Sequence, residues 1–197
     1  MATIQPVWPM VRTPAKTITL AEFLQQPETK PGREYIDGQI IQKPMPQGQH
    51  SRIQQKLINA INAVTEDDRI ALALPELRCT FGGRSIIPDV SAFRWQRLPT
   101  NDDGTIANTF SAAPDWTIEI LSPEQSSTRV VSNILHCLNH GGLGGWLVDP
   151  NENLVQVYLP DQLPTSLEAA ENELTMTDLA PALMLTVGQV FGWLRIG

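Results

Sequence analysis

Residues 112–150 constrain the fold more than any other stretch, because their pattern predicts a strand, a helix and a second strand in succession. The first strand, residues 116–121 (WTIEIL), alternates its side chains between two faces with a period of two. Aliphatic residues at three- and four-residue spacings then predict a helix that stops at Gly141 and Gly142. The run 144–150 (GGWLVDP) is typical of a buried strand ended by proline. Such a unit favours a right-handed crossover between parallel strands, so the sequence predicts an α/β fold.

Glu119 is the chemically informative residue of this unit, because it lies among aliphatic neighbours in the first strand. A carboxylate is rarely buried there unless it is paired or binds a cation, since desolvating an unpaired charge is costly. Asp89 raises the same question inside residues 85–93, whose β-branched and aromatic residues predict one continuous strand. The partner of these two carboxylates is expected to be either a metal ion or an arginine, Arg78 or Arg84.

The rest of the chain predicts short elements joined by proline and glycine turns. Thr19 and Glu22 form a capping-box pattern at the start of a short helix that ends at Pro27. Asp37 and Gly38 are a hairpin signal between strands 34–36 and 39–41. The other expected elements are a helix over 50–64, strands over 70–74, 77–81 and 154–158, and a final helix with Val187, Val190, Phe191 and Leu194. The long segment 98–113 is expected to be a loop that borders the functional site.

Length and composition indicate a globular protein. A chain of 197 residues favours one domain over 1–197, with a loose segment at 1–16 and an acidic, irregular segment at 160–185. The N-terminus lacks the apolar core of a signal peptide, and no apolar run reaches the roughly 18 residues of a membrane span. We therefore expect a cytoplasmic protein with no membrane partner.

The net charge of −7 argues against a generic nucleic-acid-binding protein. The acidity lies mainly at the C-terminal end, because Arg195 is the one basic residue after residue 129, against seven acidic residues. Arginines in the earlier part are expected to form a positive rim near Asp89 that faces phosphate; solvated arginines on edge strands are the alternative. The rim would consist of Arg78, Arg84, Arg94 and Arg97. The candidates for DNA contact are Arg78, Arg84 and Arg129.

Five motifs follow one another over most of the chain: EYIDG at 34–38, His50 at the start of a helix, PDV at 88–90, APDW at 113–116 leading to EILSP at 119–123, and GWLVDP at 145–150. In this order and spacing they resemble the Uma-two family, a group of restriction-endonuclease-like proteins in the PD-(D/E)XK nuclease superfamily. The resemblance implies a mixed β-sheet flanked by helices and a metal-dependent DNA endonuclease. It implies Asp89 and Glu119 as metal ligands and Glu34 as an additional acid at the same site.

The residue types fit that chemistry. Mg²⁺ or Mn²⁺ prefers hard oxygen ligands, and phosphodiester hydrolysis needs a cation that polarises the phosphate and lowers the pKa of the attacking water. Two carboxylates brought together without a cation would raise each other's pKa. A homodimer is also expected, because this superfamily cuts two strands with two subunits and because Trp95 and Trp193 would otherwise be exposed.

The chain departs from the superfamily pattern at one catalytic position. The superfamily has a lysine two residues after the glutamate, where Leu121 stands here. In many Uma-two proteins a lysine on the following helix takes its place, and that position is Asn133 here. A neutral amide cannot offset charge that develops at the scissile phosphate. Lys43 and Arg129 are the candidate substitutes. We expect weak or absent cleavage of DNA, with a catalytically inactive binding or assembly protein as the alternative.

A second constellation lies near the end of the expected helix. His136 and His140 are four residues apart with Cys137 between them, a spacing that can hold zinc, but no fourth ligand is evident. The position of His140 at a helix end gives it a simpler, dipole-stabilising role.

Overall fold

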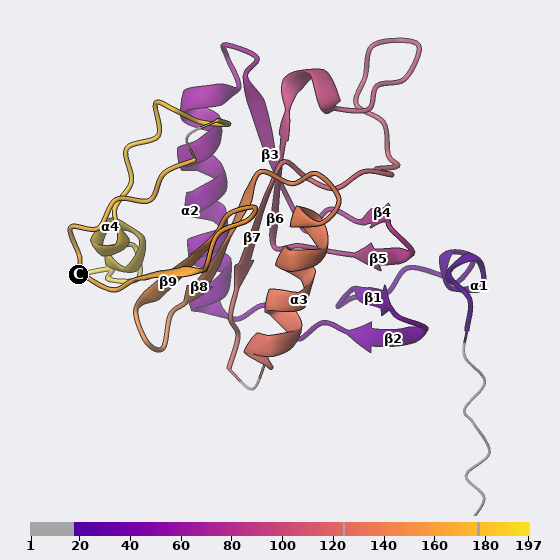
Figure 1. The fold of residues 1–197 in the computed structure, drawn as a ribbon, viewed down its shortest axis with the longest axis horizontal. Helices are drawn as coiled ribbons and strands as arrows, with labels where there is room; N and C mark the ends of the chain where they lie inside the picture. Colours follow the sequence, from indigo (N-terminus) through magenta and orange to yellow (C-terminus); the bar gives the residue numbers. More distant parts are fainter. Residues whose placement is uncertain (1–17, 124, 177) are drawn as a thin grey trace, which may run out of the picture.

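The computed structural model describes residues 18–123, 125–176 and 178–197 (Figure 1), so the segment 1–16 expected to be loose lies outside the described residues. The helices are α1 (Leu20–Leu24), α2 (Gly48–Thr65), α3 (Ser127–Leu138) and α4 (Val187–Gly192), with a short 3-10 helix at Trp95–Arg97. The strands are β1 (Arg33–Ile36), β2 (Gln39–Gln42), β3 (Ala71–Pro75), β4 (Cys79–Phe81), β5 (Arg84–Ile86), β6 (Val90–Arg94), β7 (Trp116–Ile120), β8 (Gly144–Asp149), β9 (Leu154–Tyr158) and β10 (Thr165–Leu167).

The strands form two sheets. The larger sheet has the order β10-β9-β8-β7-β6-β3, and the smaller one has the order β2-β1-β5-β4. In the larger sheet β7 and β8 run parallel, and the neighbours on both sides of this pair are antiparallel. Helix α3 connects β7 to β8. The predicted strand–helix–strand unit and the mixed α/β class are therefore confirmed.

The two long helices cover opposite faces of the larger sheet (Figure 1). From α2, Ile53 and Leu57 pack in one core cluster with Ile118 of β7. From α3, Ile134 packs in another cluster with Leu121, just after β7. Each buried aliphatic side chain contributes about 1.5–3 kcal/mol, so both helices are firmly attached to this sheet. All five residues of β7 are buried, as expected for a central strand covered on both faces.

The predicted continuous strand over 85–93 is wrong. The chain forms β5 in the smaller sheet and β6 in the larger sheet, and residues 87–89 pass from one sheet to the other. Pro88 explains the break, because it has no N–H to donate to a strand ladder and keeps the preceding residue in an extended conformation. Asp89 consequently lies at the junction of the two sheets and not on a strand face.

Other local predictions hold. Thr19 and Glu22 form both hydrogen bonds of the capping box, and the hairpin β1–β2 turns at Asp37 and Gly38, which have positive φ values of 49° and 83°. The segment 160–185 contains the short strand β10, so the expectation that it is irregular is only partly right. Among the described residues, no helix combines the length and apolar character needed to cross a membrane.

Candidate active site

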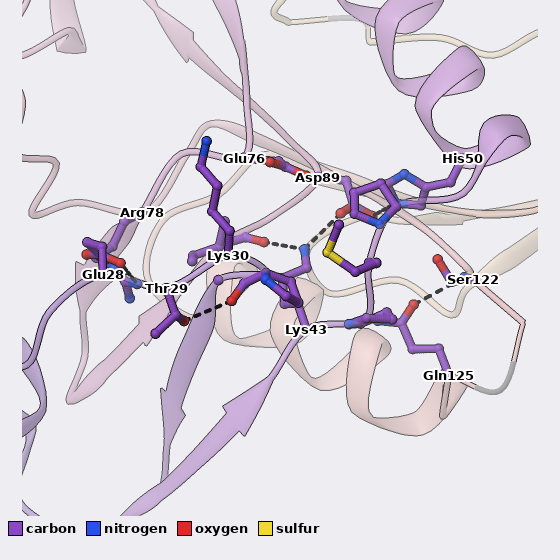
Figure 2. Close-up of a pocket in the computed structure, with 16 residues that line it drawn as sticks. Glu28, Thr29, Lys30, Lys43, His50, Glu76, Arg78, Asp89, Ser122 and Gln125 are labelled. Atoms are coloured by element: carbon purple, nitrogen blue, oxygen red, sulfur yellow. Dashed lines mark hydrogen bonds and ion pairs between the residues drawn. The ribbon is translucent and has the colours of Figure 1, made fainter.

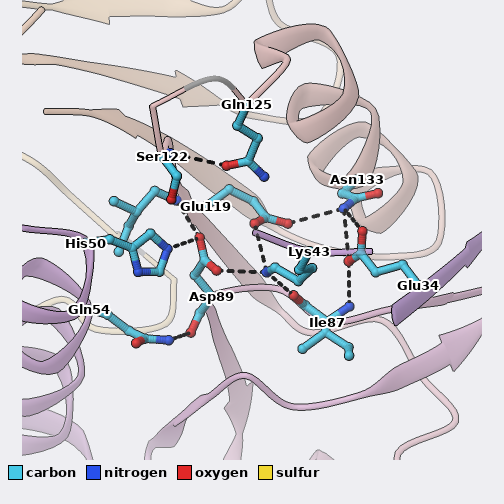
Figure 3. Close-up of polar contacts among 11 residues, drawn as sticks. Glu34, Lys43, His50, Gln54, Ile87, Asp89, Glu119, Ser122, Gln125 and Asn133 are labelled. Carbon is cyan, nitrogen blue, oxygen red and sulfur yellow. Dashed lines mark hydrogen bonds and ion pairs between the residues drawn. The ribbon is translucent and has the colours of Figure 1, made fainter. Parts of the chain in front are cut away.

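Four residues predicted for catalysis meet where the two sheets adjoin (Figure 3). Glu34 comes from β1 in the smaller sheet, Glu119 from β7 in the larger sheet, Asp89 from the junction between them, and Asn133 from α3. Glu34 and Asn133 are each 4% exposed, Asp89 is 2% exposed and Glu119 is 1% exposed. The structure thus gathers three buried carboxylates and one amide from four different elements.

The cation beside these carboxylates is Lys43, which follows β2. Its ammonium Nζ lies 2.8 Å from Asp89 Oδ1 and 3.8 Å from Glu119 Oε2, and it donates a hydrogen bond to the backbone carbonyl of Ile87. The backbone N–H of Lys43 donates to the carbonyl of Gly32 at 2.9 Å, which fixes the origin of the side chain. Lys43, one of the two candidate substitutes for the missing lysine, therefore lies between the two predicted metal ligands.

Asp89 is oriented by groups from three directions. The backbone N–H of Ile120 donates to Asp89 Oδ2 at 2.8 Å, and His50 Nε2 lies 3.0 Å from the same oxygen. Because a carboxylate only accepts, this contact requires the proton of a neutral His50 ring to be on Nε2. Gln54, one turn further along α2, donates to the backbone carbonyl of Asp89 at 2.8 Å.

His50 and Gln54 were not among the predicted site residues. The sequence showed His50 only as the residue that opens a helix, and Gln54 matched no motif. A signal for His50 existed, since its three- and four-residue spacing places it on the apolar face of α2 with Ile53, Leu57 and Ile61, where a polar ring needs a partner.

Asn133 joins the two glutamates. Its amide Nδ2 lies 3.3 and 3.4 Å from the two oxygens of Glu34 and 3.4 Å from Glu119 Oε1, so these are long hydrogen bonds. Glu34 is also held by the backbone N–H of Ile87, which donates to Oε1 at 2.8 Å. The carbonyl oxygen Asn133 Oδ1 is buried and has no hydrogen-bond partner among the described residues. The side chain at position 133 therefore reaches both glutamates without supplying charge.

The electrostatics of the cluster follow from three carboxylates and one ammonium. Burial alone would lower the pKa of Lys43, but the charges of Asp89, Glu119 and Glu34 raise that pKa above its ordinary value. Burial would raise the pKa of Asp89, but the charge of Lys43 and the hydrogen bond from His50 hold it below its usual range. Burial, together with the charges of Asp89 and Glu34, raises the pKa of Glu119 well above its ordinary value although Lys43 acts against this. Three carboxylates therefore share one ammonium group, and the raised pKa of Glu119 reflects a charge that this lysine does not fully offset.

This excess of carboxylate oxygen fits a hydrated divalent cation. Asp89 Oδ1 and Glu119 Oε2 both face the same ammonium group, at 2.8 and 3.8 Å from its nitrogen. Among the described residues, no group of three or more His, Cys, Asp or Glu side chains forms a ready metal cage. Mg²⁺ does not require one, because it usually keeps several waters and binds through one or two carboxylates.

Two cavities reach the site. The larger cavity, about 450 Å³, is lined by residues 28–32 and 43–46 and has Lys43, His50 and Asp89 in its wall (Figure 2). The smaller cavity, about 350 Å³, includes Glu34, Asn133 and Arg129. Lys43, Pro44 and Gln125 belong to the walls of both cavities. Asp89 thus borders the larger cavity and Glu34 the smaller one, whereas Glu119 lines neither.

The predicted arginines are not gathered around Asp89, so the alternative that Arg78 or Arg84 pairs with Asp89 or Glu119 is wrong. Arg78 pairs with Glu28 and Arg84 with Asp37, both at 2.7 Å, because the β1–β2 hairpin and the segment before it supply nearer carboxylates. The other two arginines of the expected rim, Arg94 and Arg97, lie 3.9 and 2.7 Å from Asp115. Of the three candidates for DNA contact, Arg78 lines the larger cavity and Arg129 the smaller one, whereas Arg84 lines neither.

Two further expectations concern segments away from the carboxylates. None of residues 98–113 lines either cavity, so the expectation that this loop borders the site is wrong. His136 Nε2 lies 3.2 Å from the carbonyl of Phe81, and His140 Nδ1 lies 2.8 Å from the carbonyl of His136. These two histidines therefore have backbone partners in place of a shared metal ligand set.

A mixed sheet flanked by helices, together with the acidic residues gathered beside its central strand, matches the restriction-endonuclease-like class of fold. The chain belongs to the Uma2 family, described as "Putative restriction endonuclease", whose family model matches residues 20–188. It is similar to the crystal structure of "a putative nuclease belonging to DUF820" from Anabaena variabilis, with 53% sequence identity and a TM-score of 0.89. That similarity covers 90% of this chain and 99% of the other. No curated protein matches the chain.

Proposed function

We propose that this protein is a metal-dependent endonuclease that hydrolyses phosphodiester bonds in DNA. The observation that carries the proposal is the convergence of three buried carboxylates around one ammonium group, in a chain of a nuclease family. Such a cluster is costly to bury, because charged groups lose their hydration. A cluster retained at that cost, beside two cavities, is the arrangement expected of an active site.

Asp89 and Glu119 would hold the cation, through the oxygens that now face Lys43. When bound, Mg²⁺ or Mn²⁺ supplies polarisation of the phosphate and a lower pKa for the attacking water. His50 and the N–H of Ile120 keep the carboxylate of Asp89 in one orientation. Such support is needed because metal ligands function only when their geometry is fixed.

Lys43 would provide the cationic group that the superfamily places on the central strand. Its ammonium already contacts Asp89 and Glu119, so a phosphate oxygen that approaches these carboxylates meets a fixed positive charge. Asn133 would position Glu34 and Glu119 through its amide and would not act on the phosphate itself. Glu34, held by the N–H of Ile87, is the additional acid of the site.

The test is cleavage of supercoiled plasmid DNA in Mn²⁺ or Mg²⁺, by the native protein and by Glu119→Gln. The native protein should nick or linearise the plasmid, and Glu119→Gln should lower the rate at least 100-fold. Glu76→Gln is the matched control, because Glu76 is exposed at the larger cavity and its carboxylate forms no hydrogen bond or ion pair with Asp89, Glu119 or Glu34. Its backbone N–H donates to the carbonyl of Asp89, a bond that the substitution leaves in place. Cleavage that survives Glu119→Gln, or that is insensitive to chelation of the metal, would refute the proposal.

A second candidate is a nuclease-fold protein that binds or assembles without cleaving. The observation in its favour is that position 133 carries a neutral amide, while Lys43, the cation at the cluster, is engaged with both metal-ligand candidates. The two candidates are separated by Lys43→Met and by Lys43→Met combined with Asn133→Lys. An active enzyme should lose cleavage in the single variant and regain about 100- to 1000-fold in the double variant, the usual effect of a charge aimed at the transition state. A native protein that is inert, and stays inert as Asn133→Lys, supports the binding candidate.

A further inference from the structure

The acidic cluster lies below the surface of the protein, so access to it limits which form of DNA can react. Asp89, Glu119 and Glu34 are all buried, and the two cavities are the routes described above. A phosphate within intact duplex DNA is part of a wide, stacked helix whose bases remain paired. The phosphates lie on the outside of that helix, but the helix as a whole is too wide to enter a recess, whereas a single strand or a nucleotide taken out of the stack can enter one.

The larger cavity has the size of a small-molecule site. Its volume of about 450 Å³ lies within the ~300–1,000 Å³ that is typical for ligands of drug-like size. One nucleotide unit falls in this range, whereas a stack of base pairs does not. The cavity is continuous with the site, because Lys43, His50 and Asp89 form part of its wall (Figure 2).

The lining combines apolar surface with polar groups, as a nucleotide requires. Pro31, Pro44, Met45 and Ile87 supply apolar contacts for the faces of a base. Thr29 and Gln125 supply polar groups for the edge of the base. In the Gln125 amide, the oxygen Oε1 accepts from the N–H of Ser122, which leaves the nitrogen Nε2 as a donor for a ligand. Contacts with base faces depend little on base identity, so this lining favours a sequence-tolerant site.

The lining of the cavity has three cationic side chains (Lys30, Lys43 and Arg78) and three carboxylates (Glu28, Glu76 and Asp89), and two lysines from different segments are placed to meet phosphate. Lys43 is beside the carboxylates, and Lys30 is exposed at the rim and forms no ion pair with the described residues. The third cation of the lining, Arg78, is paired with Glu28. A nucleotide within a strand has a phosphate on each side, so one phosphate at Lys43 and the next near Lys30 would place its base in the cavity.

We propose that the larger cavity receives one unpaired nucleotide next to the scissile phosphate, so that the protein acts on single-stranded or locally unpaired DNA. This inference rests on the proposed function, since it specifies the substrate of the same site. The cost of unpairing a nucleotide in a duplex is a few kcal/mol and is absent for a strand that is already single. The protein should therefore prefer single strands over duplexes of the same sequence.

The test measures binding by fluorescence anisotropy, with a labelled 20-nucleotide strand and the matched duplex, in Ca²⁺ under conditions where no cleavage is detected. The native protein should bind the single strand at least ten-fold more tightly than the duplex. Lys30→Glu should weaken binding of the single strand about ten-fold. Lys56→Glu, an equal change of charge on α2 away from both cavities, should weaken it less than three-fold.

The outcomes separate this inference from the proposed function. Equal or tighter binding of the duplex, or equal effects of Lys30→Glu and Lys56→Glu, overturns the inference. The proposed function still stands in that case if the native protein cleaves plasmid DNA in Mn²⁺ and Glu119→Gln abolishes this cleavage. If the protein neither binds nor cleaves DNA of either form, the proposed function fails and the inference fails with it.

Discussion

Replacing Lys43 with methionine tests the electrostatics of the site directly. Methionine keeps an unbranched apolar chain, so the main change is the loss of the ammonium group. Asp89 and Glu119 would then face each other in a buried site without their shared cation. Removing one partner of a buried ion pair costs about 3–5 kcal/mol, out of a usual total stability of about 5–15 kcal/mol. We expect the lower end, about 3 kcal/mol, because Asp89 keeps its hydrogen bonds from Ile120 and His50.

The cost should depend on pH in a defined direction. In the native protein the pKa of Asp89 is depressed, so its contribution to stability is present above the unfolded value of about 3.9 and is lost as pH falls. The pKa of Lys43 is raised, so its contribution is fully present below the unfolded value of about 10.4 and is lost as pH rises through the folded value. Both contributions are complete between these limits. In Lys43→Met the carboxylates can relieve their repulsion only by taking up a proton, so the cost should shrink as the pH is lowered from 8 to 5.

The measurement is urea denaturation of both proteins at pH 8, 6.5 and 5 in the absence of divalent metal. Lys56→Met on α2 is the control: Lys56 is half-buried but forms no ion pair among the described residues, so this change should alter the free energy of unfolding by less than about 0.5 kcal/mol. A cost below about 1 kcal/mol at pH 8, or a cost that does not change with pH, would show that Lys43 does not neutralise the cluster.

Three other results are expected. Because the pKa of Glu119 is raised, this side chain destabilises the folded state increasingly as pH rises above its unfolded pKa of about 4.3. Glu119→Gln should therefore be about 0.5–2 kcal/mol more stable than the native protein at pH 8 without metal. Lower stability of the variant would contradict the raised pKa of Glu119. Mn²⁺ at 100 times its dissociation constant should stabilise the native protein by about 2.7 kcal/mol and Asp89→Asn much less. Thermal denaturation and calorimetry measure both effects. Equal stabilisation of the two proteins would show that the ion binds away from Asp89. Light scattering should give twice the 21.8 kDa mass of one chain if the expected homodimer forms, and a monomer at micromolar concentration would count against it.

The aromatic argument for that homodimer is weaker than the sequence suggested. Trp95 and Trp193 are both partly buried, and Trp193 packs against the main core cluster. Neither tryptophan therefore requires a second subunit to cover it. The prediction of a dimer now depends on the resemblance to nucleases that cut two strands.

The parts of the fold that could be predicted are those whose signal is local. The β7–α3–β8 unit has a clear change of hydrophobic period, and the hairpin has Asp37 and Gly38 at its turn. The break at Pro88 also had a local signal, but the β-branched and aromatic residues around it suggested continuity. A missing backbone donor prevailed over side-chain propensity at that position.

The site itself depends on contacts that sequence spacing does not reveal. Lys43 meets Asp89 across 46 residues, and Asn133 meets Glu34 across 99. Lys43 lies outside the regular elements, so no periodicity indicated the direction of its side chain. The carboxylates were identifiable because a charge within an apolar run is conspicuous, whereas their cation lay in a proline-rich segment where a lysine is unremarkable.

The passage of residues 87–89 between the sheets makes the site sensitive to the docking of the two sheets. Glu34 belongs to the smaller sheet and Glu119 to the larger one. The segment 87–89 that joins the sheets contributes three groups to the site: the N–H of Ile87, the carbonyl of Ile87 and the carboxylate of Asp89. The spacing of the carboxylates is therefore set by how two separate layers fit together and not by the shape of one layer. A substitution in the packing between the layers, far from any acidic residue, should change metal affinity before it unfolds the chain.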